Sequence, residues 1–266
     1  MWKGLEIDRY AAQEGVQQVA FKALSSLAPA NDLLPNKRKP LESFLSQMFD
    51  AVLAAHPAAL SEVIKGMRRA RIPGPVIAEV YVPVIARRLG DAWVADTLDF
   101  GAVTIGSARL QGLLRKLERD WAVPVMPLPK NPPAFLVGVG QGQQHTLGAA
   151  VLAGQLRHRG MSVNLDLELT SDSLVRHVLD QELSGVLLSA AACDDLASLR
   201  EFVCVIRQHG RITPVFIGGS ILTQSVDIKI QPGADLVTQG VENVLNFCDI
   251  RTVAQDDTFA LEQEVK

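Results

Sequence analysis

The chain has 266 residues, of which 48% are hydrophobic and 21% are charged, and its formal net charge is −3. This composition excludes a disordered chain, and the charge argues against independent binding to nucleic acid or to an anionic membrane. No apolar run reaches the roughly 20 residues that span a bilayer, the N-terminus lacks the apolar core of a signal peptide, and the three cysteines form no Cys-x-x-Cys pair. We therefore expect a cytoplasmic protein with reduced, mostly buried thiols, built from two small domains rather than one large one.

Residues 1–40 are predicted to be an N-terminal extension and linker. Residues 14–27 have apolar residues at helical spacing, whereas residues 28–40 contain prolines and the basic run Lys37-Arg38-Lys39. The basic run could contact a phosphate group or a partner, but a solvated linker is the favoured interpretation.

Residues 41–123 are predicted to form a helical bundle that serves as a cap domain. Short loops between amphipathic helices are typical of an antiparallel bundle. Residues 124–133 are rich in proline and are predicted to be a semi-rigid linker. The helices are expected at residues 41–56, 57–71, 76–92, with a kink or restart at Pro83, and 98–121.

Residues 134–250 are predicted to alternate strands with helices. Such βα units form a parallel sheet that is covered by helices on both faces, and a flavodoxin-like strand order, 2-1-3-4-5, is favoured. The fold class is therefore α/β, with a helical bundle followed by a flavodoxin-like five-stranded sheet, and residues 251–266 are a frayed, charged tail. Strands are expected at 134–139, 162–167, 185–189, 214–218 and 236–239, and helices at 145–159, 171–181, 196–209, shortly after Ser220, and at 241–248.

Polar or small residues follow three of these strands. His145 comes after the first strand, Ser189 ends the third, and the pair Gly218-Gly219 follows the fourth. Because these strands are neighbours in a 2-1-3-4-5 sheet, the residues should converge on one crevice at its carboxyl edge. There His145 offers an imidazole nitrogen and Ser189 a hydroxyl, while the glycine pair leaves space for a flat or long group.

Other chemistries match the residues less well. The segment 138–142 is rich in glycine, but it lacks the register of a G-x-G-x-x-G dinucleotide loop because His145 stands where the last glycine is needed. Acidic pairs such as Asp194-Asp195 are interpreted as helix caps or solvated residues rather than as acid–base catalysts. No Ser/His/Asp or Cys/His arrangement indicates an enzyme.

His145-Thr146-Leu147-Gly148, Ser189 and Gly218-Gly219 together resemble the D-x-H-x-x-G, S-x-L and G-G signature of base-off/His-on cobalamin-binding domains. The resemblance implies that His145 is the lower axial ligand of cobalt, and that the nucleotide tail passes beside Ser189 and the glycine pair. The turn from Gly90 to Trp93 resembles the Gly-Glu-x-Trp turn of the helical cap in that family. This implies that Trp93 covers the upper face of the corrin.

The chain departs from the family pattern at several positions. Gln143 stands in place of the aspartate, so it could orient the imidazole but adds no charge. Ser189 is followed by two alanines, which widens the slot. In the cap, Val94 and the pair Val103-Thr104 replace the histidine and the Glu-His pair of light-sensing relatives that hold adenosylcobalamin. A small upper ligand such as hydroxide is therefore expected rather than an adenosyl group.

The layout of the whole chain resembles the AerR/PpaA antirepressors of purple photosynthetic bacteria. This resemblance implies a photoreceptor and transcription regulator, not an enzyme, that binds cobalamin and acts on a PpsR/CrtJ-type repressor of photosynthesis genes. It would then reach DNA indirectly through that partner. One alternative is a corrinoid shuttle of a methyltransferase system, against which Gln143 counts. Another alternative is a haem-binding sensor on the same scaffold, which no Cys-x-x-Cys-His or Cys-Pro motif supports.

Overall fold

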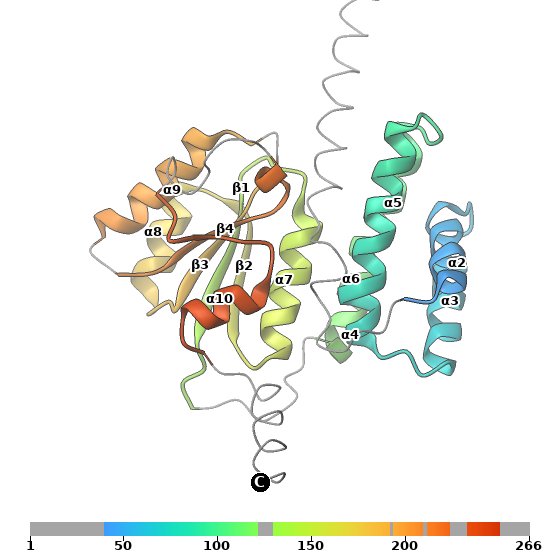
Figure 1. Ribbon diagram of the computed structural model, residues 1–266, viewed down its shortest axis with the longest axis horizontal. Coiled ribbons are helices and arrows are strands. Elements are labelled where there is room, and N and C mark those ends of the chain that lie inside the picture. The colour runs from blue at the N-terminus through green and yellow to red at the C-terminus, as the bar shows by residue number, and fades with distance from the viewer. Residues whose placement is uncertain (1–39, 122–129, 192–193, 210–211, 224–232, 251–266) are drawn as a thin grey trace, which may run out of the picture.

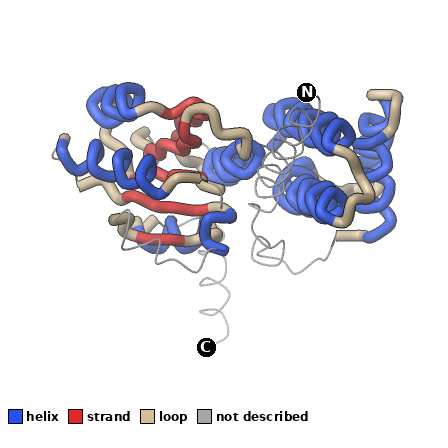
Figure 2. Tube along the Cα trace, turned by 90° about the horizontal axis from the view of Figure 1, so that it is seen from above, coloured by secondary structure: helices blue, strands red, loops and turns tan. Residues whose placement is uncertain are grey.

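The computed structural model describes residues 40–121, 130–191, 194–209, 212–223 and 233–250. A helical region (residues 40–121) lies beside an α/β region (residues 130–250), and the two are side by side when seen from above (Figures 1 and 2). The predictions for residues 1–39, for most of the proline-rich linker and for residues 251–266 lie outside the described residues. Within the described ranges, no helix combines the length and the apolar composition that crossing a membrane would need.

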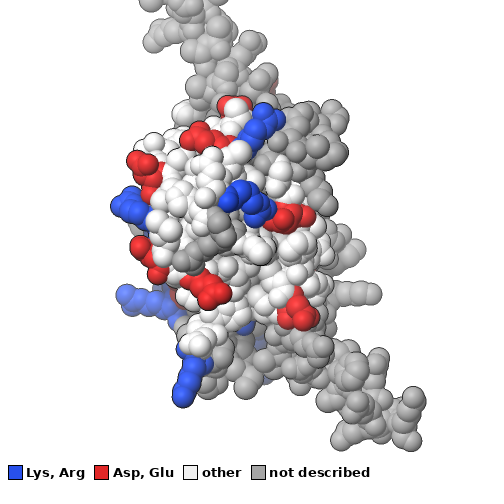
Figure 3. Space-filling view, turned by 90° about the vertical axis from the view of Figure 1, so that its left-hand side faces the viewer, with Lys and Arg blue, Asp and Glu red and all other residues white. Residues whose placement is uncertain are grey.

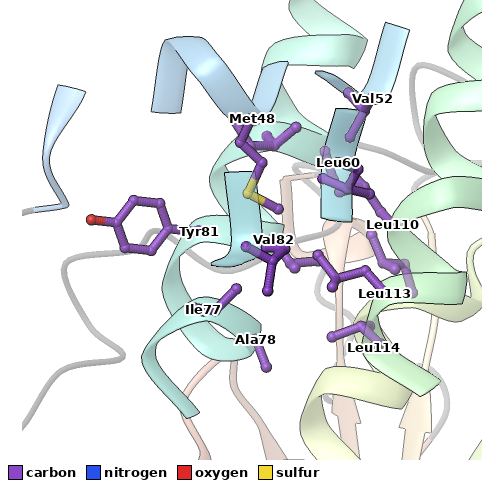
Figure 4. Packing of buried hydrophobic residues seen from close by; sticks show 14 of the residues in the cluster. Met48, Val52, Leu60, Ile77, Ala78, Tyr81, Val82, Leu110, Leu113 and Leu114 are labelled. Carbon is purple, nitrogen blue, oxygen red and sulfur yellow. The ribbon is translucent and has the colours of Figure 1, made fainter. Parts of the chain in front are cut away.

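The helical region is built around one apolar core. Buried side chains from several helices meet there, and Figure 4 shows Met48 of α2, Val82 of α5 and Leu110 of α6 among them. The amide of Leu41 donates a hydrogen bond to the Tyr81 hydroxyl, which fixes the start of the region to this core. The elements are α2 (Glu42–Leu53), α3 (Ala58–Arg69), α4 (Gly74–Val76), a π-helix η1 (Ile77–Tyr81), α5 (Val82–Val94) and α6 (Phe100–Trp121).

The α-helix restarts at Val82, next to Pro83, in agreement with the expected kink or restart, and a π-helix precedes it. Proline has no amide hydrogen, so Pro83 cannot bond the carbonyl of Glu79 four residues earlier. The chain instead makes a wider turn, in which the Val82 amide donates to the Ile77 carbonyl. This turn carries the side chain of Glu79 into the interior, where it is 8% exposed. Such π segments are rare and often lie at functional positions.

The α/β region contains a five-stranded parallel sheet with the order β2-β1-β3-β4-β5, which confirms the predicted topology. Its strands end close to the predicted residues, except that β5 has only two residues. The elements are β1 (Ala134–Gly140), α7 (Thr146–His158), β2 (Ser162–Leu169), α8 (Ser171–Asp180), β3 (Gly185–Ser189), α9 (Leu196–Gln208), β4 (Val215–Gly218), a 3-10 helix η2 (Ser220–Thr223), β5 (Leu236–Val237) and α10 (Val241–Phe247).

Helices cover both faces of the sheet. Alternate residues of β1 point to opposite faces, so Leu136 packs in the core beneath α8 and α9, whereas Phe135 and Val137 pack in the core beneath α7 and α10. Figure 1 shows α8 and α9 on the side of the sheet away from the helical region, and α7 on the side towards it. Helix α7 also contributes Leu147 and Val151 to the core of the helical region, and thus joins the two regions.

The cysteines are less buried than the sequence suggested. Cys204 is exposed, Cys248 is partly buried, and Cys193 lies outside the described residues. Burial raises the pKa of the Cys248 thiol. The expectation of mostly buried thiols is therefore wrong for Cys204, because it lies on the outer side of α9, away from the residues that this helix packs against the sheet.

Candidate functional site

A slot lies at the carboxyl edge of the sheet, between α7, the ends of β3 and β4, and α10. It is lined by Gly148, Ser189, Gly218 and Gly219, so four of the predicted site residues meet there. Pro83 of α5 lines it as well and brings the helical region to its rim. The cavity volume is about 80 Å³, the space of a few water molecules, so a long ligand group could enter only if the slot widened.

The glycine pair is required by the backbone around it. Gly219 has φ +108°, a conformation that favours glycine, and a β-carbon there would overlap the carbonyl oxygen of Ala190. A β-carbon at Gly218 would lie 2.8 Å from the carbonyl oxygen of Thr238. The pair therefore allows three chain segments to approach closely at the edge of the slot, in addition to leaving it without side chains.

His145 lies next to the slot and is buried, with 4% of its surface exposed. It stands at the N-cap position of α7, after a loop that turns at Gly142 (φ +76°). Its Nε2 atom is 3.3 Å from the carbonyl oxygen of Ser189 and 3.0 Å from Oδ2 of Asp194. Because both partners are acceptors, Nε2 carries the proton, and in the neutral imidazole the lone pair is on Nδ1.

Asp194 is a site residue that the sequence analysis missed. Its side chain is 9% exposed, and its Oδ2 atom also accepts a hydrogen bond of 2.8 Å from the Ala191 amide. The neighbouring Asp195 caps α9 through the Ala197 amide, as expected of an acidic residue at a helix start. The cap interpretation therefore holds for Asp195, whereas Asp194 contacts the imidazole. The sequence feature that could have identified Asp194 is its position shortly after β3, at the same edge of the sheet as His145.

The other predicted site residues take different places. Gln143 is half-buried in the loop before α7, where its backbone N–H donates to the Gly140 carbonyl. The carboxylate at the imidazole comes from Asp194. Trp93 is 4% exposed in the core of the helical region, with its ring centroid 6.4 Å from that of Phe100. The slot-lining residue from α5 is Pro83 and not Trp93.

A buried polar network connects the helical region to α7 beside the slot. Oε1 of Glu79 accepts a hydrogen bond of 2.8 Å from the Trp121 indole, and Oε2 accepts one of 3.4 Å from the Gln155 amide. Gln155 also lines the slot. The hydroxyl of Thr146, next to His145, accepts a hydrogen bond from Gln111 of α6. Both the slot and the His145 loop are thus tied to the helical region.

Comparison with known proteins places this site in a family context. Residues 133–245 match the model of the B12 binding domain. The chain is 32% identical over 181 residues to an uncharacterized 20.5 kDa protein in the bchF-crtJ intergenic region of Rhodobacter capsulatus, covering 67% of this chain and 93% of that protein.

Two solved structures are among the matches, and the first of them supports the fold. The monomethylamine corrinoid protein of Methanosarcina barkeri matches with a TM-score of 0.60 and 16% identity, over 77% of this chain and 97% of that one. A cobalamin-binding protein from Desulfitobacterium hafniense matches with a TM-score of 0.40 and 18% identity, over 80% and 98% of the two chains. The first of these likenesses extends over both the helical region and the sheet, and it concerns the fold alone.

Proposed function

Because the chain belongs to the family of B12-binding domain proteins, we propose that it is a cobalamin-binding, light-responsive regulator of transcription that acts through a protein partner. One observation carries the proposal. Four residues predicted for the cofactor line a single slot at the carboxyl edge of the sheet, with His145 directly behind Ser189, all within the matched residues 133–245. This edge is where parallel α/β sheets bind their ligands.

The slot residues suit the cofactor in chemistry, although the slot is narrow. Small residues at the ends of β3 and β4 leave backbone rather than side chains along the slot, and Ser189 offers a hydroxyl to a nucleotide tail. His145 has a lone pair on Nδ1, because Nε2 is occupied by acceptors. When bound, cobalamin supplies a cobalt ion whose upper ligand light can exchange. This chain would hold the tail in the slot through Ser189 and the glycine pair, and His145 would offer its imidazole lone pair to the cobalt.

The proposal for the ligand opposite His145, on the upper face of the cofactor, comes from the sequence. Val94 is 58% exposed at the end of α5 and offers apolar surface rather than a ligand, whereas Val103 is buried in the helical core and is not available as a ligand. This supports a small upper ligand such as hydroxide. Since Trp93 lies in the helical core and Pro83 lines the slot, a position of Trp93 over the corrin would require the helical region to shift.

Two observations support a regulatory role without direct DNA binding: the distribution of charged side chains on the surface, and the gene position of the relative from Rhodobacter capsulatus. Figure 3 shows acidic and basic side chains interspersed over the described part of the face that carries α8 and α9, with no basic patch there. The relative from Rhodobacter capsulatus is encoded between bchF and crtJ. We therefore take a PpsR/CrtJ-type repressor of photosynthesis genes as the partner, with DNA reached only through it, and we assign no catalytic reaction to this chain.

Absorption spectroscopy tests the cofactor part of the proposal. Cofactor-free protein is mixed with hydroxo-, methyl- and adenosylcobalamin, in the dark and after illumination, then freed of unbound corrinoid. We expect the wild type to retain hydroxocobalamin with a shifted spectrum and to retain adenosylcobalamin poorly, and His145→Ala to lose the shift. Failure of the wild type to retain any cobalamin, or identical spectra for the alanine variant, would contradict cobalamin binding through His145.

A gel-shift assay with a purified PpsR/CrtJ-type repressor and its operator DNA tests the regulatory part. We expect the cobalamin-loaded wild type to release the repressor from DNA in a light-dependent way, and His145→Ala to have no such effect. A methyl-transfer assay with methylcobalamin-loaded protein and a thiol acceptor is run beside it. Catalytic turnover there, without any effect on the repressor, would overturn the regulatory role in favour of a corrinoid shuttle.

A further inference from the structure

We infer that Asp194 is the residue that positions the His145 imidazole for its ligand, in place of the acid that is absent at Gln143. This inference rests on the proposed function, since it concerns the same histidine. It adds a residue from a different loop, about fifty positions along the chain, that no sequence motif connects to the site.

The contact is short and shielded from water. Nε2 of His145 and Oδ2 of Asp194 are 3.0 Å apart, and the two side chains are only 2% and 9% exposed. A hydrogen bond between charged or polar groups is stronger where water does not compete for it. At this burial, a contact with a carboxylate holds the ring far more firmly than it would at the surface.

Asp194 is itself held in place. Its Oδ2 atom accepts the hydrogen bond from the Ala191 amide, and Asp195 next to it is fixed as the cap of α9. The Ala191 amide follows β3, so the carboxylate is anchored to the sheet and not to a free loop. The second acceptor of the imidazole, the Ser189 carbonyl, is at the end of β3 itself. One acceptor at the strand end and one bonded to the amide just after it thus define the orientation of the ring.

This arrangement determines the tautomer of the imidazole. Neither a carbonyl nor a carboxylate oxygen can donate a proton, so Nε2 must carry one. The carboxylate also makes the ring a stronger electron donor at Nδ1, because it stabilises partial positive charge on the imidazole. Gln143 carries no charge and cannot supply this effect. Asp194 therefore provides both the orientation and the charge.

The inference predicts a change in the cofactor-free protein, which tests it independently of cobalamin. In protein labelled with ¹⁵N-histidine, the ring nitrogens of His145 are assigned by comparison with His145→Ala. We expect the wild type to show the Nε2–H tautomer. We expect Asp194→Ala to show a mixture of tautomers, because the shorter contact of 3.0 Å is lost and of the two acceptors the Ser189 carbonyl remains, at 3.3 Å. Asp195→Ala is the matched control, because it removes the adjacent acid but not the contact with the imidazole, and it should match the wild type. A wild-type tautomer in Asp194→Ala would overturn the inference.

Electron paramagnetic resonance of bound cob(II)alamin provides the second measurement. A lower ligand from ¹⁵N-labelled histidine splits the cobalt lines into doublets, whereas the cofactor's own ¹⁴N base splits them into triplets. We expect doublets for the wild type and for Asp195→Ala, and a loss of doublets with about 10- to 100-fold weaker cobalamin binding for Asp194→Ala. Asp194→Asn keeps the shape without the charge, and should fall between the wild type and Asp194→Ala.

The outcomes separate the inference from the proposed function. Absence of doublets in the wild type contradicts His145 as the cobalt ligand, and with it the proposed function. Doublets in the wild type and equally in Asp194→Ala leave the ligand intact but overturn the role of Asp194. Stronger binding or stronger doublets in Asp194→Ala also overturn it, because Asp194 would then hold the histidine away from the cofactor.

Discussion

The two faces of helix α7 show different ways of packing against a neighbour. The face towards the sheet is apolar and small: Ala149, Ala153 and Leu156 are fully buried against the strands. The face towards the helical region combines Leu147 and Val151 with polar groups that reach specific partners. The partners are Gln111 for Thr146, Glu79 for Gln155, and Glu118 for Arg157.

The difference indicates that the interface of α7 with the sheet is fixed, whereas its interface with the helical region can change its hydrogen bonds. Apolar burial is non-directional and costs a cavity when it is lost, so the sheet-facing side of α7 supports the fold. Hydrogen bonds depend on orientation, and a buried group that loses its partner costs free energy, so the other side can rearrange only if its polar groups find new partners. That side adjoins the slot through Gln155 and the His145 loop through Thr146. A change at the slot therefore reaches the helical region through directional contacts.

Truncating a side chain on the sheet-facing side of α7 should have the largest effect on the free energy of unfolding. Leu156→Ala removes a fully buried side chain from the core between α7 and the sheet, and should lower the free energy of unfolding by about 2–5 kcal/mol. Urea denaturation followed by circular dichroism measures this. Leu179→Ala on α8, where the side chain is 53% exposed, is the control and should change stability by no more than about 0.5 kcal/mol. Equal losses in the two variants would show that α7 is not a supporting element.

Removing the buried carboxylate of Glu79 should have the second largest effect on the free energy of unfolding. Glu79→Ala leaves the Trp121 indole N–H without its acceptor, and a buried unsatisfied donor costs about 1–3 kcal/mol. Glu79→Gln keeps an oxygen for the indole and should cost less than about 1 kcal/mol, because the Gln155 amide can turn to accept from the new NH₂ group. The same denaturation experiment compares the two variants. If the glutamine variant were as unstable as the alanine variant, the charge of Glu79 would matter more than its hydrogen bonds.

A glycine-to-alanine pair tests how closely the two regions approach. A β-carbon at Gly154 of α7 would overlap the buried Trp121 ring, so Gly154→Ala should destabilise by about 1–2 kcal/mol after the gain in helix propensity is subtracted. Gly112→Ala in α6 meets only the flexible Arg115 side chain at 3.8 Å, and should stabilise by about 0.5–1 kcal/mol. Stabilisation by both substitutions would mean that Trp121 does not pack on α7 in solution.

The sequence predicted the sheet because its signals are local. The apolar run of β3 gave the observed bounds, Gly185–Ser189, and the short βα units limited the strand order to the one observed. Gly218 and Gly219 were found because they directly follow a predicted buried strand, at the edge of the sheet where ligands bind. These features depend on residues close together in the chain.

The sequence could not predict contacts between distant segments. Asp194 was interpreted as a helix cap because it adjoins a true cap, and only the fold shows that its loop reaches His145. The π-helix at residues 77–81 depends on where the widened turn before Pro83 can place Glu79, which requires Trp121 and Gln155 as partners. A motif predicted that Trp93 covers the corrin. In the structure its ring is buried in the core of the helical region, and this packing is a sufficient reason for a tryptophan there.

The smallest effect on the free energy of unfolding should come from breaking the ion pair between Arg157 and Glu118, on the side of α7 that faces the helical region. Nη1 of Arg157 and Oε1 of Glu118 are 2.9 Å apart, but the side chains are 28% and 51% exposed, so water and salt screen their attraction. Glu118→Gln should cost about 0.2–1 kcal/mol in dilute buffer and less in 1 M salt, measured by urea denaturation at both salt concentrations. Arg157→Ala should cost more, because Arg157 also donates to the Val163 carbonyl and so ties α7 to β2. A large, salt-independent loss in Glu118→Gln would instead place this pair among the contacts that hold the two regions together.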